Sequence, residues 1–248
     1  MTSTNLPFHK LDWPAPDNIR AGYTLRYPGE SHAPFHGFNL ARHVGDSELA
    51  VTQNRNALKQ LVDKPVCWLS QTHSNLVLAA DGSNLGSEAD GAWTRNSEMV
   101  AAVMTADCLP VFLCDQQGDQ VAVVHAGWRG LLSGIIENAV DTFAQPGSNL
   151  LAYLGPAIGP SAFEVGGEVR DLFITESIES TSGFAAGRNE NKWLADIYQL
   201  ARVRLMRKGI DHIYGGTECT FSDQDKFFSY RRDGATGRMA NLIWKSET

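Results

Sequence analysis

The chain has 248 residues, of which 43% are hydrophobic and 20% charged, an ordinary composition for a globular protein. A net charge of -7, without any long cluster of Lys and Arg, argues against a nucleic-acid partner. No linker, low-complexity tract or internal repeat is visible. We therefore expect a single domain over residues 1–248, with residues 1–18 as a peripheral N-terminal segment.

The sequence shows no sign of export or of a membrane span. No basic region followed by an apolar stretch opens the chain, and no apolar run approaches the ~20 residues that cross a bilayer. The four cysteines form no CxxC pair and indicate reduced thiols rather than a disulfide framework. We expect a cytoplasmic protein without a membrane partner.

In chain order, strand and helix patterns alternate irregularly. A strand at residues 19–27 is followed by a loop rich in Gly, Pro and His, and Asp46 can cap a helix over residues 47–62. Further strands are predicted at residues 66–70, 76–80, 99–105, 111–114, 121–124, 150–154, 210–214 and 239–244. Further helices are predicted at residues 131–143, 168–174 and 192–208, the last ending at Gly209. This order indicates a mixed α/β or α+β domain rather than a regular βαβ array.

Three residues that can bind metal each interrupt an apolar run. His73 ends VCWLSQTH, Cys108 follows AAVMTAD, and His125 ends VAVV. Each alone is more often structural, because a single Cys is commonly a small buried hydrophobe and a single His a hydrogen-bonded core residue. Strand ends of one sheet converge, so the three together favour a zinc site whose fourth position is left for water.

Four longer motifs, MTADCLPVFLCD, VVHAGWRGL, LGPAIGPSAFEVGGEV and FFSYRRDGATGRMANLIW, resemble the YfiH family of bacterial proteins, also called the polyphenol oxidase or laccase-domain family. The resemblance implies an α+β fold, a layered α/β/β/α single domain with mixed β-sheets. It also implies a zinc site of His73, Cys108 and His125. The activity that it implies is a purine nucleoside phosphorylase acting on adenosine and inosine, with adenosine deaminase and methylthioadenosine phosphorylase side activities.

Phosphorolysis needs a basic group that holds phosphate near the anomeric carbon, where positive charge develops. Arg129, in a glycine-flanked turn at a helix start, is the first choice for this contact, and Arg42 and His43 are the second. Arg129 could equally brace the turn. For deamination, Asp107 is the acid or base nearest in sequence to the metal ligands, and it could equally orient a metal-bound His.

Three other functions stay open at this point. A copper-dependent polyphenol oxidase could use His73, Cys108 and His125 as a copper centre, but only seven histidines exist, without an HxH pair for a multicopper cluster. An amide hydrolase that edits peptidoglycan precursors could use Cys108 as nucleophile and His125 as base. A metal-stabilised binding module would have no turnover. We expect small-molecule partners, purine nucleosides and phosphate, and a monomer or homodimer.

Overall fold

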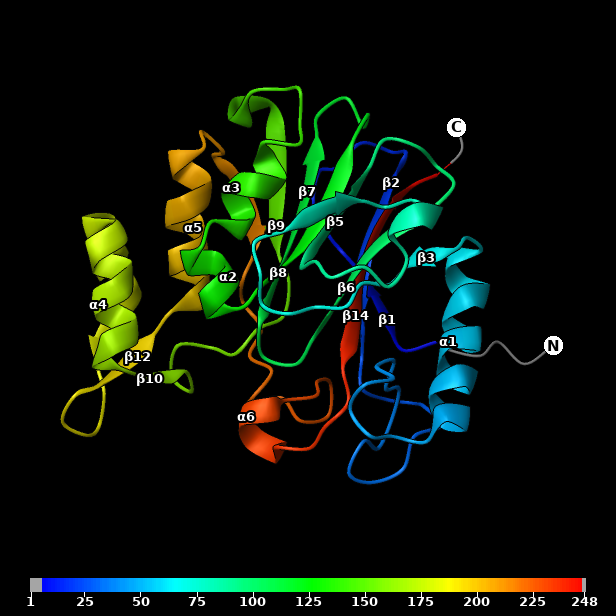
Figure 1. The fold of residues 1–248 in the computed structure, drawn as a ribbon, viewed down its shortest axis with the longest axis horizontal. Coiled ribbons are helices and arrows are strands. Elements are labelled where there is room, and N and C mark those ends of the chain that lie inside the picture. The colour runs from blue at the N-terminus through cyan, green and yellow to red at the C-terminus, as the bar shows by residue number, and fades with distance from the viewer. Residues whose placement is uncertain (1–5, 247–248) are drawn as a thin grey trace.

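Two stacked β-sheets form the centre of the protein in a computed structural model that describes residues 6–246 (Figure 1). Across the first sheet the strands are β1 (Phe8–Lys10), β2 (Ile19–Thr24), β14 (Met239–Lys245), β6 (Val100–Thr105) and β3 (Val66–Cys67). Across the second they are β13 (His212–Gly215), β9 (Leu150–Leu154), β7 (Leu109–Asp115), β8 (Val121–Ala126), β5 (Gly91–Thr94) and β4 (Val77–Ala79). A small third sheet contains β10 (Glu164–Gly166), β12 (Lys192–Ala195) and β11 (Phe184–Ala186).

Helices cover the outer faces of the two large sheets. The α-helices are α1 (Glu48–Val62), α2 (Trp128–Leu132), α3 (Ile135–Val140), α4 (Gly167–Glu176), α5 (Ile197–Arg207) and α6 (Tyr230–Asp233). The 3-10 turns are η1 (Gly82–Asn84), η2 (Gly147–Asn149) and η3 (Ile178–Gly183). Helix α1 packs on the five-stranded sheet, whereas α3 and α5 pack on the six-stranded one (Figure 1). The layered α/β/β/α fold expected from the sequence is confirmed.

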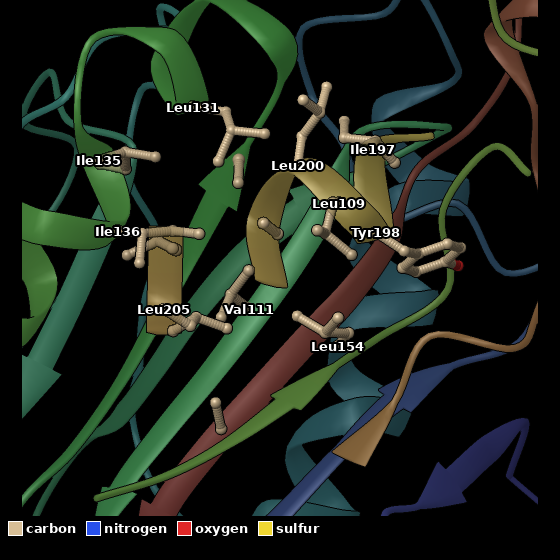
Figure 2. Close-up of a cluster of buried hydrophobic side chains, with 14 of the residues drawn as sticks. Leu109, Val111, Leu131, Ile135, Ile136, Leu154, Ile197, Tyr198, Leu200 and Leu205 are labelled. Carbon is tan, nitrogen blue, oxygen red and sulfur yellow. The ribbon is translucent and has the colours of Figure 1, made fainter. Parts of the chain in front are cut away.

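Continuous apolar strands supply two cores at once. In β8, Val121 and Val123 face the other sheet, and Ala122 and Val124 face the helices. This division follows from the two-residue period of a strand, which sends successive side chains to opposite faces. Figure 2 shows the helix-side core, where side chains of β7 and β9 meet those of α3 and α5.

None of the helices in the described residues is long and apolar enough to cross a membrane.

Three helix predictions need correction. The cap of α1 is Ser47, whose hydroxyl accepts from the Ala50 amide, while Asp46 accepts from the Asn39 side chain at 2.8 Å. The predicted helix at 131–143 is two short helices, because Gly134 between them has φ of 90°, a left-handed conformation that ends an α-helix. The start of the predicted helix at 192–208 is wrong as well.

Residues 192–195 of that prediction form β12, a strand that pairs with both β10 and β11. Helix α5 then begins after Asp196, whose side chain accepts from the amide of Gln199 at 3.0 Å. A capping aspartate inside an otherwise helical spacing marks the true start. At the other end of the chain, the segment expected to be peripheral contributes the edge strand β1 and the buried Leu11, while residues 1–5 lie outside the described residues.

Asn54 of α1 holds the long loop between β2 and α1. Its amide nitrogen donates to the hydroxyl of Ser31 at 3.1 Å and to the carbonyl of Asn39 at 2.9 Å. Its oxygen accepts from the Glu30 amide at 2.9 Å, and the residue is only 1% exposed. One buried side chain therefore satisfies several loop groups that water cannot reach.

We expect Asn54→Leu to lower the free energy of unfolding by about 3 kcal/mol, because it leaves several buried loop groups without partners. Urea denaturation measures this change. The matched control is Asn56→Leu on the same helix, where the asparagine is exposed and a change within about 0.5 kcal/mol is expected. Equal losses in the two variants would contradict the role of Asn54.

Candidate metal centre and its cavity

Three segments far apart in the sequence meet at one end of the sheets. His125 is the next-to-last residue of β8, Cys108 directly precedes β7, and His73 lies in the loop between β3 and β4. Strands β7 and β8 are antiparallel neighbours with Pro110 opposite His125. This register brings Cys108, two residues before Pro110, to the end of β8.

The donor atoms of His73, Cys108 and His125 all lie within 4.8 Å of one another. The sulfur of Cys108 is 3.9 Å from Nε2 of His73, and the two imidazole rings are 4.8 Å apart between centroids. His125 is buried, Cys108 half-buried and His73 exposed. Metal bonds of ~2.0–2.3 Å require closer donors, so small side-chain movements would bring all three donors within reach of one ion.

A buried carboxylate, missed in the sequence, holds both histidines. Oδ1 of Asp90 lies 2.7 Å from Nδ1 of His125. The carboxylate also accepts from the successive backbone amides of Thr72, His73 and Ser74, at 3.1, 3.1 and 2.6 Å. The loop that carries His73 is thus wrapped around Asp90, and the ring of His125 is fixed with its other nitrogen free for a metal or a thiol.

The electrostatics of the centre favour an ionised thiol. Burial alone would raise the pKa of Cys108, but the neighbouring His125 and His73 outweigh it and lower that pKa. Burial alone would lower the pKa of His125, but the Cys108 sulfur and Asp90 outweigh it and raise that pKa. A thiolate is the form of cysteine that binds metals and attacks electrophiles.

Gly127 allows the donors to approach. A Cβ atom at this position would lie 2.9 Å from Cδ2 of His73 and 3.1 Å from Sγ of Cys108. The first distance is shorter than such atoms tolerate, so any larger residue would displace the donors. The glycine of the HAGW motif therefore leaves room for His73 and Cys108 to approach each other.

The donors line a cavity of about 350 Å³. Its walls consist of His43, Gln71, His73, Met104, Thr105, Ala106, Cys108, His125, Tyr230 and Arg238. Arg238 supplies a positive charge to this lining, and no carboxylate belongs to the lining formed by the described residues. A cavity with metal donors, one guanidinium and no carboxylate favours an anionic or electron-rich ligand.

Residues 20–246 match the family model described as multi-copper polyphenol oxidoreductase laccase. A Pseudomonas aeruginosa relative named purine nucleoside phosphorylase PA4543 is 48% identical over 94% of this chain and 96% of its own length. An Escherichia coli relative named purine nucleoside phosphorylase YfiH is 47% identical, with the same coverage. The chain belongs to the YfiH family.

Solved structures of the YfiH family have the same fold. The Neisseria meningitidis protein NMB0706 superposes with a TM-score of 0.94 at 46% identity, covering 97% of this chain and all of the other. Bacillus licheniformis YfiH gives a TM-score of 0.89 at 28% identity, covering 97% of this chain and 99% of the other. The two-sheet arrangement that brings the donors together is therefore the arrangement of the family.

Two of the other residues singled out from the sequence of this YfiH-family chain lie elsewhere. Arg129 stacks on Trp128 at 4.3 Å from the ring centroid and does not line the cavity, which fits the bracing alternative. Arg42 does not line the cavity either, but its neighbour His43 does. Burial, followed by the positive charges of Arg238 and Arg55, lowers the pKa of His43, so this imidazole is neutral near pH 7.

Asp107 makes its hydrogen bonds to residues other than the metal donors. Its carboxylate accepts from the hydroxyl of Thr220 at 2.6 Å and from the amide of Arg231 at 2.7 Å. Both oxygens are thus engaged with the C-terminal loops. The two roles considered for Asp107, acid/base partner and support for a metal-bound His, find no geometric basis, and Asp90 occupies the second of these positions instead.

We expect Asp90→Asn to lower the affinity for a divalent transition metal by about 10–100-fold, because the amide group cannot accept from all the donors that now converge on the carboxylate. A titration with Co²⁺, followed by its thiolate absorption, measures the affinity. The control is Asp81→Asn, which changes a carboxylate that caps the turn η1. Unchanged Co²⁺ affinity in a folded Asp90→Asn protein would rule out this support role.

Proposed function

We propose that this chain is a zinc-dependent purine nucleoside phosphorylase that converts adenosine or inosine and phosphate into free base and ribose 1-phosphate. Relatives at 45–48% identity bear the name purine nucleoside phosphorylase. The observation that carries the proposal is the cavity itself, in which a three-donor metal set lies beside the guanidinium of Arg238 and the imidazole of His43, without a carboxylate. Its volume lies at the lower end of the range for small-molecule sites.

The donor set fits zinc. One thiolate and two imidazoles are ligands that zinc prefers, and three protein ligands leave a fourth position open, as in catalytic zinc sites. The lowered pKa of Cys108 supplies the thiolate before metal arrives. When bound, zinc acts as a Lewis acid that stabilises negative charge developing on the substrate. Asp90 fixes the imidazole of His125 through Nδ1, so that Nε2 would be the atom that holds zinc.

Arg238 is the best-placed residue to bind phosphate. Its Nη1 donates to the carbonyls of Thr236 and Gly237 at 2.8 and 3.0 Å, and its backbone amide is held by Asn39. Nε and Nη2 have no acceptor among the described residues, which leaves a pair of parallel donors for two phosphate oxygens. His43, neutral near pH 7, adds a hydrogen bond rather than a charge.

Adenosine deaminase and methylthioadenosine phosphorylase activities belong to the proposal as side activities. Deamination needs a group that moves protons at the purine, and the carboxylate of Asp107 is engaged with Thr220 and Arg231. We therefore expect deamination to be slower than phosphorolysis. Met104 and Ala106 give the cavity an apolar side that can accept a methylthio group.

A thiol hydrolase is the second candidate, and one observation favours it. Cys108, His125 and Asp90 form a line of nucleophile, base and orienting carboxylate, the arrangement that activates a cysteine. An oxidase of the multicopper type has less support, because the described residues hold a single cluster of metal donors. The ligand types of that cluster, one thiolate and two imidazoles, also suit copper.

Metal removal tests the proposal directly. We expect the zinc-loaded protein to release hypoxanthine from inosine only when phosphate is present, chelation to abolish this release, and zinc to restore it. Cys108→Ala should lose the metal and the activity while it stays folded, because the cores do not depend on this side chain. Cys219→Ala, which changes another half-buried thiol outside the cavity, is the control.

Two results would reject the metal mechanism. The first is phosphorolysis that survives in Cys108→Ala. The second is a metal-free protein that hydrolyses amides and is inactivated by thiol alkylation, since this is the behaviour of the hydrolase alternative.

The place of phosphate is tested by comparing two arginines. We expect Arg238→Gln to raise the KM for phosphate at least ~10-fold, about 1.4 kcal/mol of binding, because a neutral amide loses both the charge and the paired donors. Arg129→Gln should change it less than ~2-fold, and His43→Gln should have an intermediate effect. A larger loss in Arg129→Gln than in Arg238→Gln would return the phosphate site to Arg129.

A further inference from the structure

Tyr230 presents an unusually exposed aromatic ring to the cavity. The residue is 62% exposed, compared with 36% for Tyr27 and for Phe221, and among the described residues it is the one Phe, Tyr or Trp in the lining of the cavity. Its hydroxyl has no hydrogen-bond partner within the part of the chain that the structure describes. A large apolar ring left open beside a cavity gains free energy when a ligand covers it.

The backbone on either side of Tyr230 is fixed. Ser229 caps α6 by accepting from the amide of Arg232 at 3.2 Å, and the amide of Arg231 donates to Asp107 at 2.7 Å. The Arg231 guanidinium donates to the carbonyls of Ala162 and Glu164 at 3.3 and 3.1 Å. The turn is tied to two other segments while the ring of Tyr230 itself is left uncovered.

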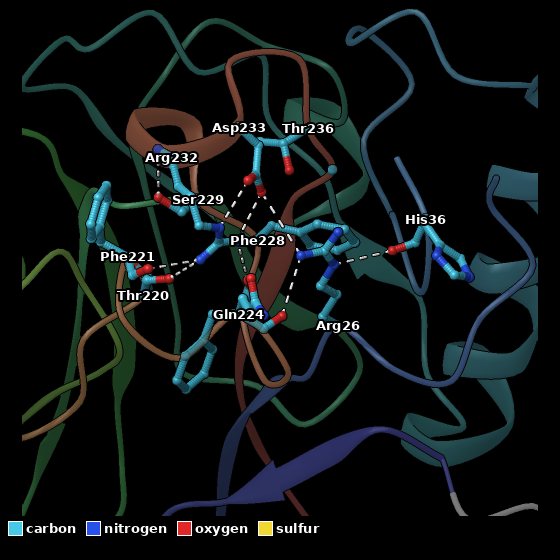
Figure 3. A network of polar contacts seen from close by, with 12 residues as sticks. Arg26, His36, Thr220, Phe221, Gln224, Phe228, Ser229, Arg232, Asp233 and Thr236 are labelled. Atoms are coloured by element: carbon cyan, nitrogen blue, oxygen red, sulfur yellow. Dashed lines mark hydrogen bonds and ion pairs between the residues drawn. The ribbon is translucent and has the colours of Figure 1, made fainter. Parts of the chain in front are cut away.

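Arg232 adds a third set of ties, drawn in Figure 3. Its guanidinium donates to the carbonyls of Thr220 and Phe221 at 2.8 and 3.0 Å and to that of Phe227 at 3.0 Å. It also pairs with Asp233, whose carboxylate lies 3.8 Å from Arg26. Because the backbone of this turn is already held, a ligand that contacts the ring does not have to order the turn, which lowers the entropic cost of binding.

The face of this ring is less covered than those of comparable aromatic residues. The guanidinium carbons of Arg55, Arg129 and Arg170 lie 4.1, 4.3 and 4.1 Å from the ring centroids of their neighbouring tryptophans, which is close stacking. Arg238 lies 6.0 Å from the ring centroid of Tyr230, at the outer limit of a cation–π contact. No closely stacked guanidinium therefore competes with a ligand for the ring.

We propose that Tyr230 is the platform on which the purine base stacks, and that α6 is the rigid turn that holds this platform over the cavity. This inference rests on the proposed function and names the residue that selects a planar base. A base is a flat π-system, and its stacking on an aromatic side chain tolerates different substituents on the ring. Adenosine and inosine differ in one such substituent, so one platform serves both.

The test is the equilibrium binding of inosine to the zinc-loaded protein without phosphate, measured by calorimetry. Tyr230→Ala should raise the dissociation constant about 10-fold or more, whereas Tyr230→Phe, which keeps the ring, should stay within about 3-fold of wild type. The KM for phosphate should be unchanged in both variants. Tyr27→Ala, which removes an exposed tyrosine outside the cavity, is the matched control and should bind as wild type does.

The outcomes separate this inference from the function on which it rests. If wild type phosphorolyses inosine and Tyr230→Ala binds inosine equally well, the stacking role is overturned and the function stands. If Tyr230→Phe loses as much affinity as Tyr230→Ala, the hydroxyl and not the ring makes the contact, and the inference fails. A wild-type protein that neither binds nor phosphorolyses a purine nucleoside overturns both. Because the side chain is exposed, we expect Tyr230→Ala to fold, and its near-ultraviolet circular dichroism verifies this.

Discussion

The buried carboxylate of Asp90 is the interaction on which the geometry of the centre depends. A fully buried charge is unfavourable unless hydrogen bonds and opposite charge compensate it, and Asp90 obtains both. Three successive amides, the hydroxyl of Ser74 and the ring of His125 converge on its two oxygens. The same group therefore shapes the loop of His73 and orients the ring of His125, which are 52 positions apart in the sequence. Its backbone carbonyl also accepts from the amide of His125 at 2.7 Å, which ties the start of β5 to the end of β8.

Two residues at the same centre have a strained backbone conformation. His73 and Asp107 have φ of 61° and 86°, a left-handed conformation that costs a residue with a side chain of the order of 1–3 kcal/mol. Each is held there by specific hydrogen bonds, His73 through Asp90 and Asp107 through Thr220 and Arg231. The two sheets supply the rigid frame against which these loops are held, because their strands are buried on both faces.

The sequence predicts the two sheets better than the metal centre. The reason is that strand patterns are local in the sequence, whereas the contacts of the centre join residues that are far apart. Strands such as residues 121–124 are visible because apolar runs are local, and His73, Cys108 and His125 stand out because they interrupt such runs. Asp90 could not be found in this way, since its partners lie 17 and 35 positions away and short β5 has no clear pattern. Asp107 is predicted as an acid or base because it lies next to Cys108 in the sequence. Neighbouring residues at a strand end, however, point in different directions. The break at Gly134 is a single residue in an otherwise helical spacing.

His73 helps to decide between the two chemistries that Cys108, His125 and Asp90 allow. A thiol hydrolase needs one imidazole as its base, which His125 already provides, and a second imidazole 4.8 Å away has no part in that mechanism. In a metal site the same imidazole is the third ligand. The fold keeps His73 in a strained conformation, uses a buried carboxylate to hold it, and leaves Gly127 without a side chain so that its ring fits beside the sulfur. These costs are explained if the thiolate and both imidazoles share one ion, and they have no explanation in a Cys–His–Asp triad alone.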